Sequence, residues 1–364
     1  MNEKKKEPFF HIVKRDALPW YQSVGIRAIA IVLALIVCAI VTTITTGINP
    51  IQVYESMIIG AFGSARKTWV TFQNISVLLL IALALTPAFK MKFWNIGAEG
   101  QFYMGAFGAA SMAFMCPDLP PILLLPLMCV AGFVCGGLWA LIPAVIKARF
   151  GASETLVTLM MNYIAIAFIS YLQYGPWKDP AALGAAKVPN FSENAVLPDV
   201  FGIHAGWIIM LVLVIIMTIL LRYTKLGYQI DVIGESETTA KYAGMNTVKI
   251  LVIAVLISGG LCGMAGFMQS SAVEKSITDS MSAGLGFTAV ITAWLAKLKP
   301  PVIVVASFMF SILLQSGSSL QVMKIPSSIT EIMQGVIIFF VLACEFFINY
   351  KISLRKHTAV KEAE

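Results

Sequence analysis

The sequence predicts an all-α protein that crosses a membrane many times. Of its 364 residues, 58% are hydrophobic and 12% are charged, whereas soluble domains carry about 25% charged residues. A soluble fold of this length exposes roughly a quarter of its unfolded surface, so it could not hide this much apolar surface from water. The apolar residues also form long unbroken runs, which β-barrels lack because their strands alternate every second residue. Composition therefore excludes a soluble enzyme, a soluble nucleic-acid-binding domain and a disordered chain.

The number of expected spans follows from the charged residues that interrupt the chain. A helix needs about 20 apolar residues to cross the hydrocarbon core. We expect about ten transmembrane helices, because ten long runs contain no charge apart from Glu345 in the last: 28–54, 68–89, 100–117, 119–146, 155–177, 200–221, 250–273, 280–296, 300–323 and 332–350. The first run is too long for the apolar part of a signal peptide and precedes no Ala-x-Ala cleavage site, so we expect it to be retained.

Lysine and arginine predict the orientation, because they are enriched in cytoplasmic segments. If the N-terminus is cytoplasmic and the spans are ten, 20 of the 26 basic residues lie inside, and the other six lie outside: Arg66, Lys67, Lys178, Lys187, Lys275 and Lys324. Both termini are then expected in the cytoplasm. The net charge of +7 is explained by this topology, and we expect no nucleic-acid partner.

This topology divides the chain into three parts. We expect a basic cytoplasmic segment (1–27), a transmembrane domain (28–350) and a cytoplasmic C-terminal tail (351–364). The outer loop 175–204 contains four prolines and is expected to be ordered against the bundle or a partner. The inner loop 222–249 contains a helix-like stretch, 236–243, which Gly244 would end. This stretch is either a docking element or an ordinary solvated loop.

A few polar residues stand at the ends of apolar runs. Asn95, Glu99 and Gln101 lie at the start of one run, among glycines. An acid inside the membrane is a functional candidate by default, but an acid at the first turn of a helix is also a favourable cap, and the sequence leaves both open for Glu99. Ser153 and Glu154 are typical of a helix start. Asn162, farther along, must find hydrogen-bond partners if it is buried.

Several kinds of chemistry are missing from the sequence. There is no phosphate-binding G-x-x-x-x-G-K-[ST] loop, so the chain is not expected to hydrolyse ATP itself. The six cysteines form no C-x-x-C pair and the three histidines lie far apart, so neither a metal site nor a catalytic cluster is expected. The spans hold very few charges, which disfavours an ion-driven antiporter. An energy source supplied by another subunit fits better.

Several motifs resemble one family. The stretch NIGAEGQ at 95–101 is similar to a hallmark of permease subunits of bacterial ABC importers, in the branched-chain amino acid/ribose/nucleoside permease family, and it is most like the nucleoside (simple sugar) branch. The resemblance continues at 154–165, 234–246, 258–266, 286–289 and 334–335. The chain departs from the family pattern at Ser153, at Lys299-Pro300-Pro301 and at Ser311.

This resemblance implies a bacterial plasma-membrane importer of several parts. The chain would be a permease with a type II ABC importer-like bundle, no catalytic site and no cofactor of its own. It would pair with a second permease, identical or not, and sit among membrane lipids. A cytoplasmic ATPase would bind ATP, and an extracytoplasmic binding lipoprotein would deliver a small-molecule substrate, here a nucleoside or a related purine or sugar.

The resemblance also implies two sets of site residues. The ATPase would act on the coupling loop, for which the candidates are Glu235, Ala240, Tyr242 and Gly244. A path for a flat, mostly neutral nucleoside should be apolar, with aromatic rings and a few amides, and its candidates are Asn162, Tyr163, Phe287, Asn95, Glu99 and Gln101. The alternatives are an ion-coupled secondary transporter of a small polar solute, an ABC permease for ribose, simple sugars or amino acids, and a membrane assembly subunit without a substrate.

Overall fold

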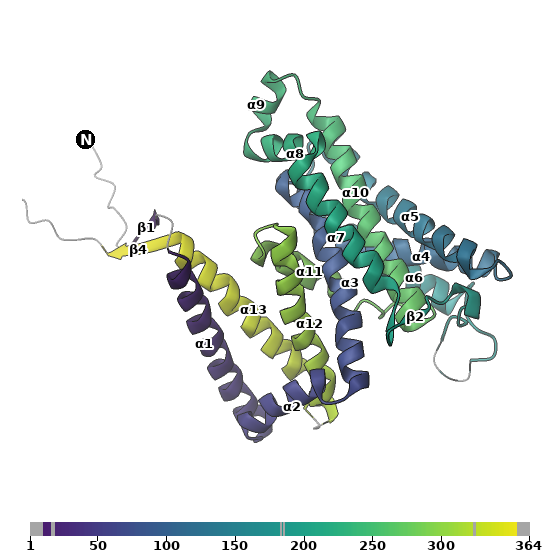
Figure 1. Ribbon diagram of the computed structural model, residues 1–364, viewed down its shortest axis with the longest axis horizontal. Coiled ribbons are helices and arrows are strands. Elements are labelled where there is room, and N and C mark those ends of the chain that lie inside the picture. Colours follow the sequence, from purple (N-terminus) through teal and green to yellow (C-terminus); the bar gives the residue numbers. More distant parts are fainter. Residues whose placement is uncertain (1–9, 16–18, 183, 185, 323–324, 355–364) are drawn as a thin grey trace, which may run out of the picture. The chain divides into compact units, whose positions relative to one another are not determined.

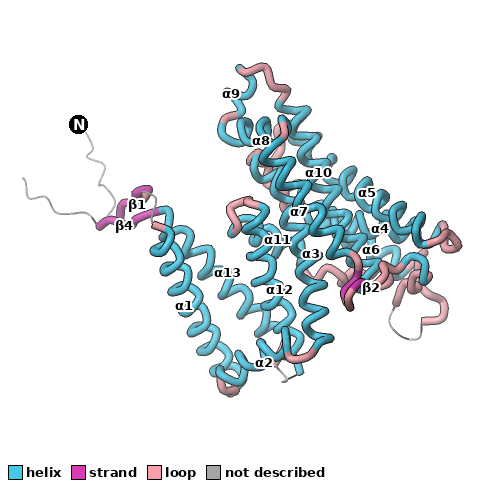
Figure 2. Tube along the Cα trace, in the orientation of Figure 1, coloured by secondary structure: helices cyan, strands magenta, loops and turns pink. Residues whose placement is uncertain are grey.

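The computed structural model describes residues 10–15, 19–182, 184, 186–322 and 325–354. Helices dominate this part of the chain, and strands occur as two short antiparallel pairs (Figure 2). The helices are α1 (Trp20–Thr46), α2 (Pro50–Phe62), α3 (Ala65–Lys90), α4 (Ala98–Met115), α5 (Pro121–Phe150), α6 (Glu154–Tyr174), α7 (Gly206–Tyr223), α8 (Lys225–Glu235), α9 (Glu237–Tyr242), α10 (Thr247–Met268), α11 (Leu285–Leu295), α12 (Pro300–Val322) and α13 (Ser327–Asn349). A 3₁₀ turn spans Glu193–Ala195, and a π-helix, Gln269–Glu274, continues α10. The strands are β1 (Phe10–Lys14), β2 (Asp199–Val200), β3 (Ile203–His204) and β4 (Tyr350–Leu354).

The expectation of an all-α membrane protein is confirmed. Among the described residues, eight helices are long and apolar enough to span a membrane: α1, α3, α5, α6, α7, α10, α12 and α13. Two of the ten expected runs behave differently. Residues 100–115 of the run 100–117 lie in α4, whose 18 residues are too polar to count as a span, and the run 280–296 yields α11, with only 11 residues. Eleven residues extend about 16 Å, roughly half of the 30 Å core. The total of ten spans and the side on which the termini lie stay predictions.

The chain forms two compact units, and the division falls within α2 and α12. Unit 2 comprises Met57–Ser316. Within it, α3 lies between α11 on one side and α7 and α10 on the other (Figure 1). From Ile75 to Phe89 every residue of α3 is buried. This helix is therefore the centre of unit 2.

Glycines allow α5 and α10 to approach closely within unit 2. Gly132 and Gly136 of α5 face Gly259 and Gly263 of α10, and a Cβ added to Gly136 would lie 2.5 Å from the carbonyl oxygen of Gly259. Both helices thus carry two glycines four residues apart, the spacing that lets backbones touch in membrane proteins. Where side chains are small, dispersion contacts between backbones replace the hydrophobic effect that drives packing in water.

Unit 1 comprises Met1–Ser56 and Gly317–Glu364. Its two long helices, α1 and α13, pack against each other, and Cys38 of α1 donates to the carbonyl oxygen of Met333 at 3.7 Å. Beyond them β1 and β4 pair in antiparallel fashion. The two ends of the described chain therefore lie side by side.

The described residues of the loop 175–204 contact the segment 271–276 through several hydrogen bonds. Phe191 donates its backbone N–H to Lys275 at 2.8 Å, and the Ser276 hydroxyl donates to the carbonyl oxygen of Val188 at 3.0 Å. The Ser271 hydroxyl donates to Ala195 at 2.6 Å. Hydrogen bonds thus hold the loop against residues 271–276, which follow α10.

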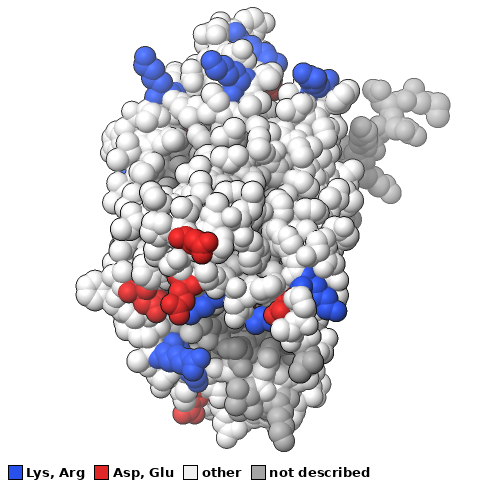
Figure 3. Space-filling view, turned by 90° about the vertical axis from the view of Figure 1, so that its right-hand side faces the viewer, with Lys and Arg blue, Asp and Glu red and all other residues white. Residues whose placement is uncertain are grey.

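Charged side chains are distributed unevenly over unit 2. On the face shown in Figure 3, Lys and Arg gather at the end that carries α8 and α9, and a broad band with few charged side chains separates that end from a mixed group of acidic and basic residues. A band of this kind is typical of a surface that faces hydrocarbon.

Candidate functional site

The turn between α3 and α4 carries a buried amide pair. The Gln101 amide donates to Oδ1 of Asn95 at 2.8 Å, and the Asn95 amide donates back to Oε1 of Gln101 at 3.1 Å. Asn95 also donates to the hydroxyl of Ser258 on α10 at 3.2 Å and accepts the Gly97 N–H at 3.1 Å. The polar groups of this irregular turn therefore find their partners inside the protein, which is where a membrane protein tolerates such backbone.

Asn162 fastens α6 to this turn. Its Oδ1 accepts the N–H of Gly100 at 2.8 Å, and its Nδ2 donates to the carbonyl oxygen of Ile96 at 2.9 Å. The side chain is buried. A Cβ added to Gly100 would lie 3.0 Å from Asn162 Oδ1, so the close approach depends on glycine there. Asn162 thus satisfies two backbone groups at the start of α4 that lack partners within the helix.

Glu99 joins the starts of two helices. It lies in the first turn of α4, and only 3% of its surface is exposed. Its carboxylate accepts the N–H of Gly286, in the first turn of α11, at 2.7 Å and also accepts the hydroxyl of Ser282. Both helices present their positive ends to this one carboxylate. Glu99 therefore lies at the start of α4, but its carboxylate caps the start of α11.

The two helices run from Glu99 toward opposite ends of unit 2. α4 ends near the outer loop, where the Asn194 amide donates to the carbonyl oxygen of Pro117 at 3.4 Å. α11 ends beside the end of α3, where Trp294 stacks on Trp94 with 4.9 Å between ring centroids. With 11 residues, α11 is too short to cross the hydrocarbon core by itself, whereas the 18 residues of α4 extend about 27 Å.

The stacked Trp94 and Trp294 form an aromatic platform with Phe89, whose ring lies 5.8 Å from that of Trp294. The two indoles are 44% and 39% exposed. Beside them, Glu154 pairs with Lys147 at 2.8 Å. Ser153 occupies the predicted N-cap position of α6, but its side chain makes no capping hydrogen bond. Glu154 is bound by a cation instead.

A second polar cluster lies toward the outer loop. The Tyr103 hydroxyl donates to the carbonyl oxygen of Asp279 at 2.6 Å, and the Ser170 hydroxyl donates to the Asp279 carboxylate at 3.1 Å. Asp279 in turn donates its N–H to Oε1 of Gln173 at 2.9 Å. Sequence reasoning missed this cluster. Its one signal was Asp279 itself, an acid directly before an apolar run.

The candidate path residues therefore separate into two groups. Asn95, Glu99, Gln101 and Asn162 converge on one buried network. Tyr163 and Phe287 follow Asn162 and Gly286 in sequence but point to the surface of the chain, with 60% and 38% exposed. The described residues contain no group of three His, Cys, Asp or Glu side chains that could hold a metal ion.

The coupling-loop candidates lie on α8, α9 and the turn after them. The predicted helix at 236–243 is confirmed as α9, with Ser236 capping it and Gly244 at a φ of 76°. α8 was not expected. It packs on the end of α3: Gly234 lies against the carbonyl oxygen of Lys90, and Lys92 donates to the carbonyl oxygen of Glu235 at 3.5 Å. Ala240 is buried, and the other three candidates, Glu235, Tyr242 and Gly244, are exposed.

Comparison with known protein families agrees with this architecture. Residues 69–342 match the permease component of the branched-chain amino acid transport system. The chain belongs to this family. Members are permease subunits of transporters without catalytic activity, so the chain is a multi-pass permease of the cell membrane and not an enzyme. The family implies an ATPase and a substrate-binding partner.

Curated relatives match the permease over most of its length. It is 30% identical to the nucleoside ABC transporter permease protein NupB of Lactococcus lactis, with 94% of this chain and 96% of NupB covered. It is 27% identical to the glucose ABC transporter permease protein TsgB13 of Haloferax volcanii, covering 93% and 92%. It is 29% identical to the guanosine ABC transporter permease protein NupP of Bacillus subtilis, covering 86% and 91%. The resemblance drawn from the motifs is confirmed.

Proposed function

We propose that this permease forms the translocation path for nucleosides, or related purines or sugars, in an ATP-driven importer. The observation that carries the proposal is the similarity to NupB over nearly the whole of both chains. NupP, a guanosine permease, supports the same substrate class. TsgB13 is a glucose permease at similar identity, and for this reason sugars stay within the proposal. A binding lipoprotein delivers the substrate, and a second permease completes the path.

The geometry supports a mechanical route from the ATPase to the path. A movement of α8 and α9 acts directly on the end of α3, because Gly234 and Glu235 contact Lys90 and Lys92. The next residues form the turn that positions Glu99, and Glu99 binds the start of α11. ATP binding in the partner thus changes the position of α11 without any chemistry in the permease. The exposed Trp94–Trp294 platform at the other end of α11 offers a flat base a stacking surface.

The substrate is tested in proteoliposomes that hold the full importer. We expect uptake of labelled nucleosides to require ATP and to be competed by unlabelled nucleosides more strongly than by glucose. Stronger competition by glucose than by nucleosides would show that the substrate is a sugar and not a nucleoside. Uptake that survives ATP depletion and collapses with the ion gradient would instead establish the secondary transporter.

The path is tested with Asn162→Ala. We expect uptake to fall at normal protein level, because the start of α4 loses two hydrogen bonds. Unchanged uptake would remove Asn162 from the path. Tyr163→Leu and Phe287→Leu test the exposed aromatic rings, and an unchanged KM for the nucleoside in both variants would remove them.

The docking surface is tested with Tyr242→Ala. Tyr242 is 89% exposed at the end of α9, and loss of its ring should weaken co-purification of the ATPase. Tyr223→Ala is the matched control, because Tyr223 is 76% exposed at the end of α7. Deletion of 236–243 should abolish co-purification altogether. A retained complex after this deletion would contradict docking at α9.

A further inference from the structure

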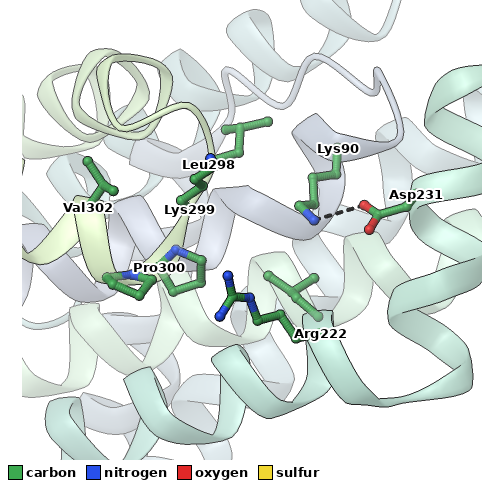
Figure 4. Close-up of a pocket in the computed structure, with 9 residues that line it drawn as sticks. Lys90, Arg222, Asp231, Leu298, Lys299, Pro300 and Val302 are labelled. Atoms are coloured by element: carbon green, nitrogen blue, oxygen red, sulfur yellow. Dashed lines mark hydrogen bonds and ion pairs between the residues drawn. The ribbon is translucent and has the colours of Figure 1, made fainter. Parts of the chain in front are cut away.

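A pocket with a basic lining lies at the end of unit 2 that carries α8. It is formed where α3 and α7 end, beside α8 and the loop that joins α11 to α12 (Figure 4). Its volume is about 490 Å³. Its polar lining comes from Lys90, Arg222, Asp231 and Lys299, and its apolar lining comes from Leu221, Leu298, Pro300, Pro301 and Val302.

The charges in the pocket leave room for an anion. Lys90 is bound to Asp231 at 2.8 Å. Within the described chain, the side chains of Arg222 and Lys299 have neither an acidic nor a hydrogen-bonding partner, and both residues are exposed. Three cations against one carboxylate give the pocket a net charge of +2. In Figure 4 the Arg222 guanidinium points into the space between Pro300 and the Lys90–Asp231 pair. A guanidinium binds two oxygens of a phosphate at once, which few other side chains can do.

The position of the pocket determines which phosphate can reach it. Arg222 lies in the last turn of α7, and Pro300 opens α12, and both helices are candidate spans. The pocket therefore opens where the hydrocarbon core meets the headgroups. Basic pockets between spans at this level suit anionic lipid headgroups. The wall of leucine, proline and valine suits the glycerol and first acyl carbons, whereas a free anion would leave it uncovered.

We propose that this pocket binds the phosphate group of an anionic phospholipid in the leaflet on the α8 side. Arg222 and Lys299 bind the phosphate oxygens, and the Lys90–Asp231 pair holds α8 against α3 as one wall. The loop with Lys299 is tightly folded, with left-handed φ angles of 51° and 55° at Lys297 and Leu298. A bound lipid therefore touches the connection that ends α11.

The test titrates the full-length permease, purified in a neutral detergent, with phosphatidylglycerol and follows bound lipid by native mass spectrometry. The variant Arg222→Gln/Lys299→Gln removes the two unpaired cations. The matched control Arg149→Gln/Lys249→Gln removes two exposed basic residues outside the pocket, one at the end of α5 and one at the start of α10. Phosphatidylcholine, with the same phosphate but no net charge, is the control lipid.

We expect the dissociation constant for phosphatidylglycerol to rise about thirtyfold in the pocket variant, since each basic residue near an anionic surface contributes roughly fivefold. The control variant should change it by less than about threefold, and phosphatidylcholine should bind more weakly than phosphatidylglycerol. Wild-type affinity in the pocket variant would overturn the proposal. Displacement of the lipid by millimolar inorganic phosphate would make this a free-anion site and overturn the lipid assignment. Loss of ATPase association with unchanged lipid affinity would assign the pocket to the ATPase instead.

Discussion

The two units use apolar helices in different ways. In unit 2, 83% of the apolar window of α3 and 67% of that of α10 are buried inside the chain, around which α5, α6 and α7 are 28%, 33% and 22% buried, whereas the figure is 18% for both α1 and α13 in unit 1. The helices of both units are strongly apolar. Where α10 meets α5 it carries glycines, whereas α1 exposes large aliphatic side chains such as Ile29 and Ile44. Hydropathy thus identifies a membrane helix, and the facing glycines of α5 and α10 mark where two such helices approach most closely.

The largest loss of stability is expected when one glycine of the α5–α10 contact is replaced by alanine. Gly263→Ala places a methyl group against the carbonyl oxygen of Gly132 and 3.0 Å from the Cα of Gly136. Since backbone cannot give way as a flexible side chain does, α5 and α10 must separate, at a cost of roughly 1–3 kcal/mol or more. We expect a lower thermal unfolding temperature in detergent, measured by fluorescence-detected gel filtration.

Gly335→Ala is the matched control in unit 1. An added Cβ at Gly335 of α13 meets no atom within 4 Å. Alanine is favoured over glycine in a helix by about 0.5–1 kcal/mol, so this variant should unfold at the wild-type temperature or slightly above it. If both alanine variants unfolded alike, the close packing of α5 on α10 would be refuted.

An effect of comparable size is expected at a buried polar group of unit 2, the carboxylate of Glu99. Glu99→Ala leaves the Gly286 N–H and the Ser282 hydroxyl buried without their acceptor, which costs about 1–3 kcal/mol for each group. Glu99→Gln keeps one acceptor oxygen and should recover part of this stability. Because α11 loses its anchor, ATP-dependent uptake should fall further in the alanine variant than in the glutamine variant.

Glu331→Ala provides the control in unit 1, since Glu331 of α13 is exposed. We expect its stability to change by less than about 0.5 kcal/mol and its uptake to equal that of the wild type. Equal thermal stability of Glu99→Ala and Glu331→Ala would show that the carboxylate of Glu99 does not hold α11.

Helix length also shows which parts of the fold could be predicted from the sequence. Of the ten apolar runs expected to span, eight coincide with helices of the described chain that are long and apolar enough to do so, because hydropathy is a local property. The runs did not predict that the run 280–296 forms the short helix α11. A hydropathy window does not distinguish a helix that crosses a membrane from a shorter one that begins beside the start of another helix, as α11 does beside α4.

The polar network shows the same limit at the level of single residues. Asn95, Glu99, Gln101 and Asn162 were identifiable because polar groups beside apolar runs need partners. Their partners Ser258 and Ser282 lie 163 and 183 residues away in the chain. A serine inside a membrane helix is ordinary, since its hydroxyl can bond its own helix, and the sequence therefore carries no sign of which serine is the partner.

The smallest expected effect concerns His204, in β3 of the outer loop. Its side chain is fully buried, Nδ1 accepts the Gly206 N–H at 3.2 Å, and Nε2 has no hydrogen-bond partner among the described residues. Burial lowers the pKa of His204 below its usual 6.5, and the nearby Asp199 opposes this only in part. The unfolded chain therefore binds the proton more readily than the folded one.

Stability should accordingly be complete above about pH 6.5 and decrease as the pH falls below that value, by at most about 1.4 kcal/mol per pH unit for one proton. His204→Asn keeps a short acceptor for the Gly206 N–H but does not titrate in this range. We expect the unfolding temperature of the wild type to fall more steeply between pH 7 and pH 5 than that of this variant, whatever their absolute values. Parallel pH profiles would mean that the His204 ring is protonated as easily in the folded protein as in water, which its burial without a partner at Nε2 opposes.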